Sequence, residues 1–339
     1  MREQALLTTI RKHTFQERNL PLTDKRQHKL FFHALAFLTM ALWGVTFVST
    51  KTLINEGLTP AQIFTIRFII AYLGLLTVCL VRGGRDKRAF SGSLRHELVF
   101  IITGITGGSL YFLTENTALS YTQACNVSFI VCIAPLLTVL LTLAIKKVFK
   151  GPFVDGLEDV KVRFPLVAGT VLALSGMIMV IFDGNGVSLS PKGDIMAFLA
   201  ALCWAIYSQF MGQMTDRYGT LFATRKVFFW GLVTIIPFLL LTDNSNLAQV
   251  RFDHVQVWGN LLFLSTIASL VCFVVWNRVM LAIGNVTATN YVYLNPVFTL
   301  IAAVIILDER MTLVSGLGSA MILGGVILAG AKKRTEQTK

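Results

Sequence analysis

The segment LFFHALAFLTMALWGVTFVSTKTL, residues 30–53, decides the fold class, because it stays apolar over a length that matches a lipid bilayer. A membrane-spanning helix needs about 20 predominantly apolar residues. The rest of the chain has the same character, since 54% of its 339 residues are hydrophobic and only 14% are charged. Soluble domains carry about 25% charged residues. The sequence therefore predicts an integral membrane protein and excludes a soluble enzyme, a disulfide scaffold and a disordered chain.

Nine further apolar runs follow the first, and Gly, Pro, Asn and Asp punctuate the gaps between them. The seventh run is the shortest, because Arg225 and Lys226 crowd its start. These runs predict an all-α protein with ten transmembrane helices, flanked by tails at residues 1–29 and 332–339. The predicted spans are Leu30–Leu53, Ala61–Val81, Leu98–Leu119, Cys125–Ile145, Phe164–Phe182, Ile195–Met211, Val227–Leu241, Val257–Val275, Ala288–Leu307 and Leu313–Ala331.

Basic residues gather on one side of this topology. If the N-terminal tail is cytoplasmic, 25 of the 30 Lys and Arg residues fall in cytoplasmic segments and 3 in the opposite loops. Cytoplasmic loops of membrane proteins are enriched in Lys and Arg. We therefore interpret the net charge of +12 as an orientation signal and not as a nucleic-acid-binding surface. In a bacterial cell this predicts an inner-membrane protein with both termini in the cytoplasm and the lipid bilayer as a partner.

The two halves of the chain are related by a shift of 161 residues. The shift places Trp43 on Trp204, and it aligns Pro135-Leu-Leu-Thr-Val with Pro296-Val-Phe-Thr-Leu. Each half, residues 30–182 and 195–331, contains five predicted helices. Because five is odd, the second copy runs through the membrane in the opposite direction. Inverted repeats recur in secondary transporters, whose substrate sites lie near the membrane midplane where the halves meet.

Short signatures are spread along the chain: Trp43-Gly44-Val45-Thr46-Phe47 with Lys51, Pro60 with Arg67-Phe68, Ala118-Leu119, Pro135, Asn295-Pro296-Val297 and Asp308-Glu309-Arg310. They resemble those of the EamA-type family of the drug/metabolite transporter superfamily. The resemblance covers roughly residues 34–331 and implies ten helices around a cavity lined by helices 1, 3, 4, 6, 8 and 9. It also implies a substrate among amino acids, sugars, metabolites and drugs. One departure is the longer basic insert Lys146–Arg163 in place of a Gly-Glu-Arg-type turn.

Polar and aromatic residues inside the spans are candidates for lining a cavity, since burial in a bilayer makes unpaired polar groups costly. The alternative is that they pack helix against helix. Trp43 and Trp204 lie too far from their helix ends to serve as interfacial anchors. The predicted cavity residues are Trp43, Thr46, Tyr111, Trp204, Tyr207, Trp276, Asn290, Tyr291 and Asn295.

Pro135 and Pro296 are predicted to interrupt the fourth and ninth helices. A mid-helix proline removes one backbone donor and frees the carbonyl four residues earlier, here that of Val131 or Val292. Interruptions at corresponding positions of two halves point toward a binding site. A fixed kink that serves packing is the alternative.

Glu115 is the acidic residue that lies well inside a predicted span. A carboxylate there must pair with a cation or take up a proton. Lys51 and Arg67 are the available cations on the same side of the predicted topology. We expect either a structural salt bridge or a role in which Glu115 couples transport to protons or contacts a cationic group.

Glycines cluster in the fifth and tenth spans, where small faces permit close approach of helices. Gly169 aligns with Gly318 and Gly176 with Gly325 at a shift of 149 residues. We expect these two helices to pack against the rest of the bundle or each other, with a dimer contact as the alternative.

The inverted repeat predicts a secondary transporter that works by alternating access. The family resemblance implies an exporter of amino acids or related small metabolites, with uptake as the alternative direction. Sugars, nucleosides or drugs are the alternative substrates, and a membrane scaffold or membrane-embedded enzyme is the alternative class. The sequence lacks a phosphate-binding loop and a His-x-x-x-His pair, so we expect no cofactor, no metal and no enzymatic activity. Its partners are expected to be a small-molecule substrate and lipid, and the chain a monomer or homodimer.

Overall fold

Helices occupy the apolar runs of the sequence, and loops fall where the turn-forming residues interrupt them. The computed structural model describes residues 22–83, 88–148, 150, 164–181, 190–242, 247, 250–283, 288, 290–309 and 312–330. Within these residues every regular element is a helix. The predicted all-α architecture is therefore confirmed. The tail at 1–21, most of the basic insert (residues 151–163) and the tail at 332–339 lie outside the described residues.

The first half contains several helices that interruptions divide further. Their bounds are α2 (Leu22–Asn55), α3 (Pro60–Arg82), α4 (Leu94–Gly104), η1 (Ile105–Ser109), α5 (Leu110–Tyr121), α6 (Ala124–Val131), α7 (Ala134–Val148) and α9 (Phe164–Ile181). The segment η1 is a single π-helical stretch that joins α4 to α5. Because α2 begins at Leu22, the end of the predicted N-terminal tail continues the first helix.

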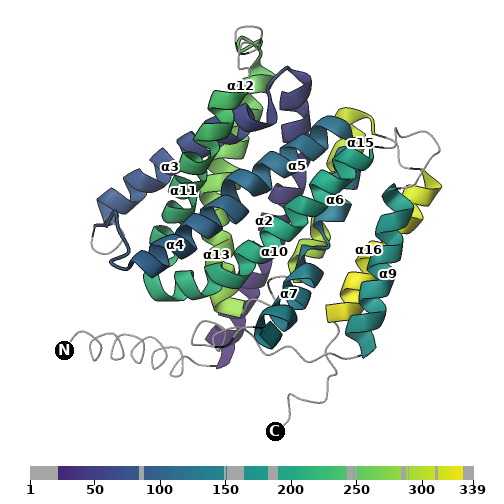
Figure 1. Cartoon of the computed structure of the whole chain (residues 1–339), viewed down its shortest axis with the longest axis horizontal. Coiled ribbons are helices and arrows are strands. Elements are labelled where there is room, and N and C mark those ends of the chain that lie inside the picture. The colour runs from purple at the N-terminus through teal and green to yellow at the C-terminus, as the bar shows by residue number, and fades with distance from the viewer. Residues whose placement is uncertain are drawn as a thin grey trace.

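The second half follows the same order of elements. Its bounds are α10 (Pro191–Tyr218), α11 (Thr220–Leu241), α12 (Val255–Leu262), η3 (Phe263–Val271), α13 (Cys272–Ile283), η4 (Asn290–Leu294), α15 (Asn295–Leu307) and α16 (Leu313–Gly330). The segment η3 is π-helical and η4 is a 3-10 helix. Figure 1 shows α2, α10 and α13 in the middle of the bundle, with α9 and α16 together at one side.

Local sequence signals explain where several helices begin. Thr59 starts α3 with a capping box: its hydroxyl accepts from the Gln62 backbone N–H at 3.3 Å, and the Gln62 side chain accepts from the Thr59 N–H at 2.9 Å. Ser190 caps α10 by accepting from the Gly193 N–H at 3.2 Å. A proline follows each cap in the first helical position, where its missing N–H has no cost.

Seven helical stretches of the described residues are long and apolar enough to cross a membrane. They correspond to the predicted spans one to four and six to eight. The other three predicted spans correspond to shorter apolar helices, Val167–Met179, Tyr291–Leu307 and Gly316–Gly325. The fold is that of a multi-pass membrane protein.

The predicted start of the seventh span at Val227 was wrong, because α11 begins at Thr220 and includes Arg225 and Lys226. Both cations are buried and have partners. Lys226 forms an ion pair with Glu97 of α4 at 2.7 Å and donates to the Ala89 carbonyl at 3.2 Å. Arg225 donates to the Arg88 carbonyl. A helix can therefore include buried charged residues that have partners, although hydropathy alone predicts that the helix begins after them.

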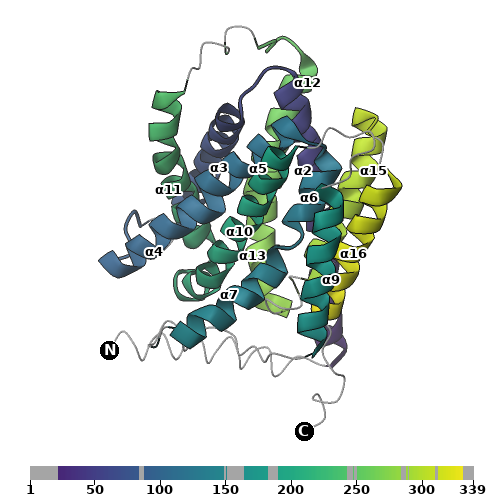
Figure 2. The same ribbon diagram turned by 45° about the vertical axis from the view of Figure 1, so that its right-hand side comes forward.

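Glycines bring α9 and α16 into close contact, which confirms the expectation that these helices pack together (Figure 2). A Cβ atom on Gly176 would lie 2.4 Å from the Gly318 carbonyl oxygen. A Cβ atom on Gly325 would lie 2.5 Å from the Gly169 carbonyl oxygen. Only glycine permits backbones to approach this closely.

Candidate central cavity

A cavity of about 50 Å³ lies in the core of the bundle, between helices of both halves. A single water needs at least about 10–15 Å³ on this measure, so the space is large enough to admit water. The cavity is mainly apolar, with one cation and one carboxylate in its lining. The lining residues are Met40, Trp43, Thr46, Phe47, Arg67, Tyr111, Phe112, Glu115, Val131, Ala134, Trp204, Phe273, Val292 and Asn295.

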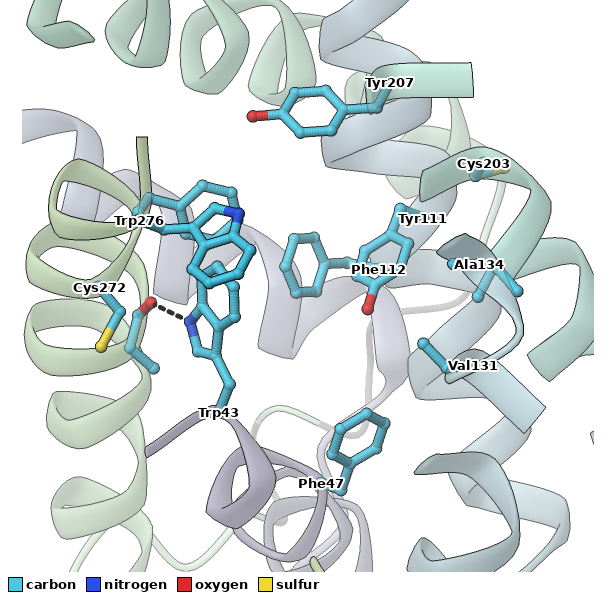
Figure 3. Packing of buried hydrophobic residues seen from close by; sticks show 14 of the residues in the cluster. Trp43, Phe47, Tyr111, Phe112, Val131, Ala134, Cys203, Tyr207, Cys272 and Trp276 are labelled. Carbon is cyan, nitrogen blue, oxygen red and sulfur yellow. Dashed lines mark hydrogen bonds between the residues drawn. The ribbon is translucent and has the colours of Figure 1, made fainter. Parts of the chain in front are cut away.

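Trp43 is the centre of an aromatic cluster on one wall. Its indole N–H donates to the Ala268 carbonyl at 3.0 Å, which fixes the orientation of the ring. The ring centroid lies 6.0 Å from that of Trp204 and 5.5 Å from that of Trp276. Figure 3 shows Trp43 and Trp276 on one side, and Tyr111, Phe112, Val131 and Ala134 on the other. This arrangement offers stacking surfaces and few hydrogen-bonding groups.

Five of the predicted cavity residues line this space, namely Trp43, Thr46, Tyr111, Trp204 and Asn295. The Thr46 hydroxyl donates to the Trp43 carbonyl at 2.6 Å, so its hydrogen is used in a bond within its own helix. The side-chain oxygen of Asn295 is buried and has no hydrogen-bond partner among the described residues.

Two predicted residues lie one layer behind the lining. Trp276 packs against Trp43, and the Tyr207 ring lies 5.2 Å from the Trp204 ring. Both side chains are buried. They support the aromatic wall and do not line the space itself.

Two further predicted residues are not part of the cavity lining. The Tyr291 hydroxyl lies 2.8 Å from Nδ1 of His33, and its ring packs beside the imidazole. Asn290 begins η4, but its side chain lies outside the described part of the structure.

Arg67 and Glu115 bring opposite charges to the cavity. Arg67 is 3% exposed and Glu115 is 6% exposed. The Tyr111 hydroxyl donates to Glu115 Oε1 at 2.7 Å. Arg67 donates from Nε to the Ser269 hydroxyl at 2.5 Å, and its guanidinium lies over the Phe112 ring at 4.6 Å from the centroid. Within the described residues, no ion pair joins Arg67 to Glu115.

Lys51 does not contact Glu115. Its ammonium donates to the carbonyls of Leu119 and Thr122, where α5 ends, with the Thr122 contact at 3.1 Å. Carbonyls at the C-terminus of a helix lack intrahelical donors and carry partial negative charge, so they hold a lysine well. Lys51 therefore ties α2 to the end of α5, and Arg67 is the cation that shares the cavity with Glu115.

Pro135 and Pro296 were predicted in the middle of helices, but the structure places each at the beginning of one. Pro135 lies in the first turn of α7 and Pro296 in the first turn of α15. The first turn tolerates proline because its N–H groups have no intrahelical acceptor. The carbonyl of Val292 accepts from the Cys132 thiol at 3.4 Å, so the two breaks touch each other.

Apolar lining residues were not identified from the sequence. Phe47 and Met40 lie four residues after and three residues before Trp43, so helical spacing places them on the same face. Val131 and Val292 are the residues whose carbonyls the prolines free. Phe112, Ala134 and Phe273 carry no signal that separates them from lipid-facing residues.

In addition to Glu115, the structure buries two acidic residues that the sequence analysis did not identify. Glu97 accepts from the Trp230 indole at 3.2 Å and pairs with Lys226. Asp194 lies in the first turn of α10 and is 3% exposed. Neither lines the central cavity. Across the residues that the structure describes, no group of three or more His, Cys, Asp or Glu residues is arranged to hold a metal ion.

The helical membrane fold and the central cavity are those expected of a polytopic transporter. The model of the EamA-like transporter family matches residues 30–152 and 191–331 of the chain. The protein belongs to this family.

Curated relatives extend over most of the chain. An uncharacterized transporter from Archaeoglobus fulgidus is 28% identical over 89% of this chain and 98% of its own length. A probable amino-acid metabolite efflux pump from Escherichia coli K12 is 24% identical over 87% of this chain and 93% of its own. The uncharacterized inner membrane transporter YedA from the same strain is 25% identical over 89% of this chain and 91% of its own length.

A solved crystal structure has the same fold. It aligns with a TM-score of 0.60 at 18% identity and covers 87% of this chain and 95% of its own. At this level of identity the match bears on the fold alone.

Proposed function

We propose that this protein is a secondary transporter that exports amino acids or related small metabolites across the inner membrane. It works by alternating access between two inverted five-helix halves, residues 30–182 and 195–331, with both termini in the cytoplasm. The transporting unit is one chain, present as a monomer or homodimer. The proposal extends the family membership to a mechanism and a class of substrate.

The observation that carries this proposal is the internal symmetry of the cavity lining. Eight of its fourteen residues form four pairs at the 161-residue shift. A cavity built from equivalent positions lies where the two halves meet. Movement of one half against the other then exposes the same space first to one side of the membrane and next to the other. The pairs are Trp43 with Trp204, Phe112 with Phe273, Val131 with Val292, and Ala134 with Asn295.

Irregularities of the helices support the same relationship. The π-helical segment η1 in the third predicted span corresponds to η3 in the eighth. The break between α6 and α7 corresponds to the end of η4, before α15. Equivalent departures from regular helix geometry in both halves are expected of a duplicated unit whose function depends on them.

Two asparagines at equivalent positions support it further. Asn116 donates to the Pro60 carbonyl at 3.1 Å, at the start of α3. Asn277, at the 161-residue shift, donates to the Thr224 hydroxyl at 2.8 Å, near the start of α11. Each amide ties the third helix of its half to the beginning of the second. Equivalent bonds of this kind favour two copies of one structural unit.

The substrate class rests on the cavity and on one relative. Aromatic walls with a few charged and polar groups suit a small molecule that is part apolar and part charged. The amino-acid metabolite named for the Escherichia coli efflux pump is such a molecule.

The test is transport by the purified full-length protein in liposomes. Radiolabelled L-leucine, L-phenylalanine, glucose and uridine are offered separately, and flux is compared with that of protein-free liposomes. We expect protein-dependent flux of an amino acid. Flux of glucose or uridine alone would replace the substrate class, and absence of flux for all four would contradict a carrier for these metabolites and favour a scaffold or an embedded enzyme.

A further inference from the structure

Arg67 and Glu115, the charged groups of the cavity, are held in place, but each has hydrogen-bonding atoms that are left without a partner among the described residues. Arg67 uses Nε for its bond to Ser269, and Phe112 supports the plane of the guanidinium. Neither terminal nitrogen of Arg67 donates a hydrogen bond within the described residues. A guanidinium presents its N–H groups in a fork that matches the two oxygens of a carboxylate. The free edge of Arg67 therefore suits a carboxylate.

Acceptors without donors share the same cavity. Glu115 Oε1 accepts from Tyr111, whereas Oε2 accepts nothing within the described residues. The side-chain oxygen of Asn295 is buried and lacks a partner in the same part of the chain. An unmade hydrogen bond at a buried polar atom costs about 1–3 kcal/mol. A ligand ammonium, with three N–H donors, satisfies both acceptors.

The fold does not require this charge pair. At the 161-residue shift, Arg67 corresponds to Phe228 and Glu115 to Trp276, and both aromatic residues are buried. The second half therefore packs its equivalent helices with apolar side chains. Buried charges are also weak support for stability, because the cost of desolvation offsets their attraction to other groups. Charges that are present in one half alone indicate a ligand with a fixed orientation.

We propose that the cavity binds a small zwitterionic α-amino acid with an apolar side chain. Its carboxylate binds the terminal nitrogens of Arg67, its ammonium binds Glu115 and the Asn295 oxygen, and its side chain packs on the aromatic wall of Trp43, Trp204 and Phe273. This inference rests on the proposed transport function and assigns the two charge-binding positions. Since the described cavity has a volume of about 50 Å³, a ligand of this size binds as the two halves separate.

The experiment measures binding to the full-length protein in lipid nanodiscs, by calorimetry and by the fluorescence of the cavity tryptophans. The probes are L-leucine, L-phenylalanine, L-leucinamide, which lacks the carboxylate, and N-acetyl-L-leucine, which lacks the ammonium. We expect leucine or phenylalanine to bind and each leucine derivative to bind at least tenfold more weakly, because each loses a charge-assisted bond.

Variants connect each charge of the ligand to one residue. Arg67→Gln is expected to bind leucine and leucinamide equally, and Glu115→Gln is expected to lose the preference for a free ammonium. Arg67→Lys keeps the charge and retains part of the preference. The matched control is Lys192→Gln, because Lys192 is exposed and lies on Tyr121 outside the cavity. Its binding profile should equal that of the unchanged protein.

The outcomes separate this inference from the transporter proposal. Equal binding of leucine and both derivatives, or an unchanged preference in Arg67→Gln, would overturn the inference. If Arg67→Gln does not fold, the four probes on the unchanged protein decide. Sugar or nucleoside flux without amino-acid binding would contradict the inference and leave a transporter. Absence of both binding and flux would contradict both.

Discussion

The indole rings of Trp43 and Trp204 meet edge to face at the core of the molecule, with centroids 6.0 Å apart and planes at 84°. The two residues are 161 positions apart, which is the shift that relates the two proposed repeats. Edge-to-face pairs bring the positive edge of one ring to the negative face of another. This contact therefore joins the first and second halves of the chain at the wall of the cavity, and the proposed alternating-access movement would separate the two rings.

Trp43→Ala is expected to destabilise the protein by about 3–5 kcal/mol, the range for truncating a buried tryptophan. It removes the hydrogen bond to Ala268 and the contacts with Trp204 and Trp276. The measurement is thermal unfolding in detergent. Trp43→Phe keeps a ring and should lose less stability; an equal loss in both variants would show that the ring contacts contribute little.

The ion pair between Lys226 and Glu97 is expected to be costly to break on one side. Lys226→Met leaves the Glu97 carboxylate buried without its cation, and such a loss costs about 3–5 kcal/mol. Adding Glu97→Leu should restore much of the stability. Arg251→Gln serves as the control. Arg251 and Asp253 form an exposed ion pair with a nitrogen-to-oxygen distance of 3.8 Å, and such pairs contribute about 0–1 kcal/mol. A double variant as unstable as Lys226→Met would contradict this account.

Gly176→Ala should disturb the contact of α9 with α16. Its new Cβ would meet the Gly318 carbonyl at 2.4 Å, and overpacking costs about 1–3 kcal/mol. Gly324→Ala is the matched control, since the nearest atom to its Cβ lies 4.0 Å away and alanine favours a helix. Thermal unfolding compares the two variants, and equal stability would argue against the close approach.

The proposed orientation predicts the side from which a residue can be labelled. The five native cysteines are buried, so they give a low background with a membrane-impermeant maleimide. Lys192→Cys should react in intact spheroplasts, and Lys147→Cys should react only after lysis. The reverse pattern would place both termini outside.

Glu115→Gln tests whether this carboxylate exchanges a proton during transport. If it does, the variant cannot bind the proton, and its flux should no longer respond to a pH gradient across the liposome. Flux is measured with and without the gradient for both proteins. An unchanged response in Glu115→Gln would assign coupling to another group or to none.

Much of the fold could be predicted from the sequence, because hydropathy and small residues act locally or at fixed spacing. The helices follow the apolar runs, and Gly176 and Gly325 mark the contact of α9 and α16. The start of α11 could not be predicted, because it depends on a tertiary partner: Glu97 and loop carbonyls satisfy Arg225 and Lys226.

The cavity could be predicted in part. Aromatic and polar residues inside spans, such as Trp43 and Asn295, stand out against an apolar background. Phe112 and Phe273 do not, since phenylalanine is equally suited to lipid. The partners of charged side chains also depend on rotation of the helices about their axes, so the sequence could not distinguish Lys51 from Arg67 as the neighbour of Glu115.

The most direct test of the central claim is counterflow in liposomes that contain the purified protein. Liposomes are loaded with unlabelled L-leucine, and the entry of labelled L-leucine is followed without an ion gradient or a membrane potential. A carrier with one cavity that faces each side in turn should accumulate label transiently above its equilibrium level, and unloaded liposomes should not. Equal entry into loaded and unloaded liposomes would contradict alternating access for this substrate.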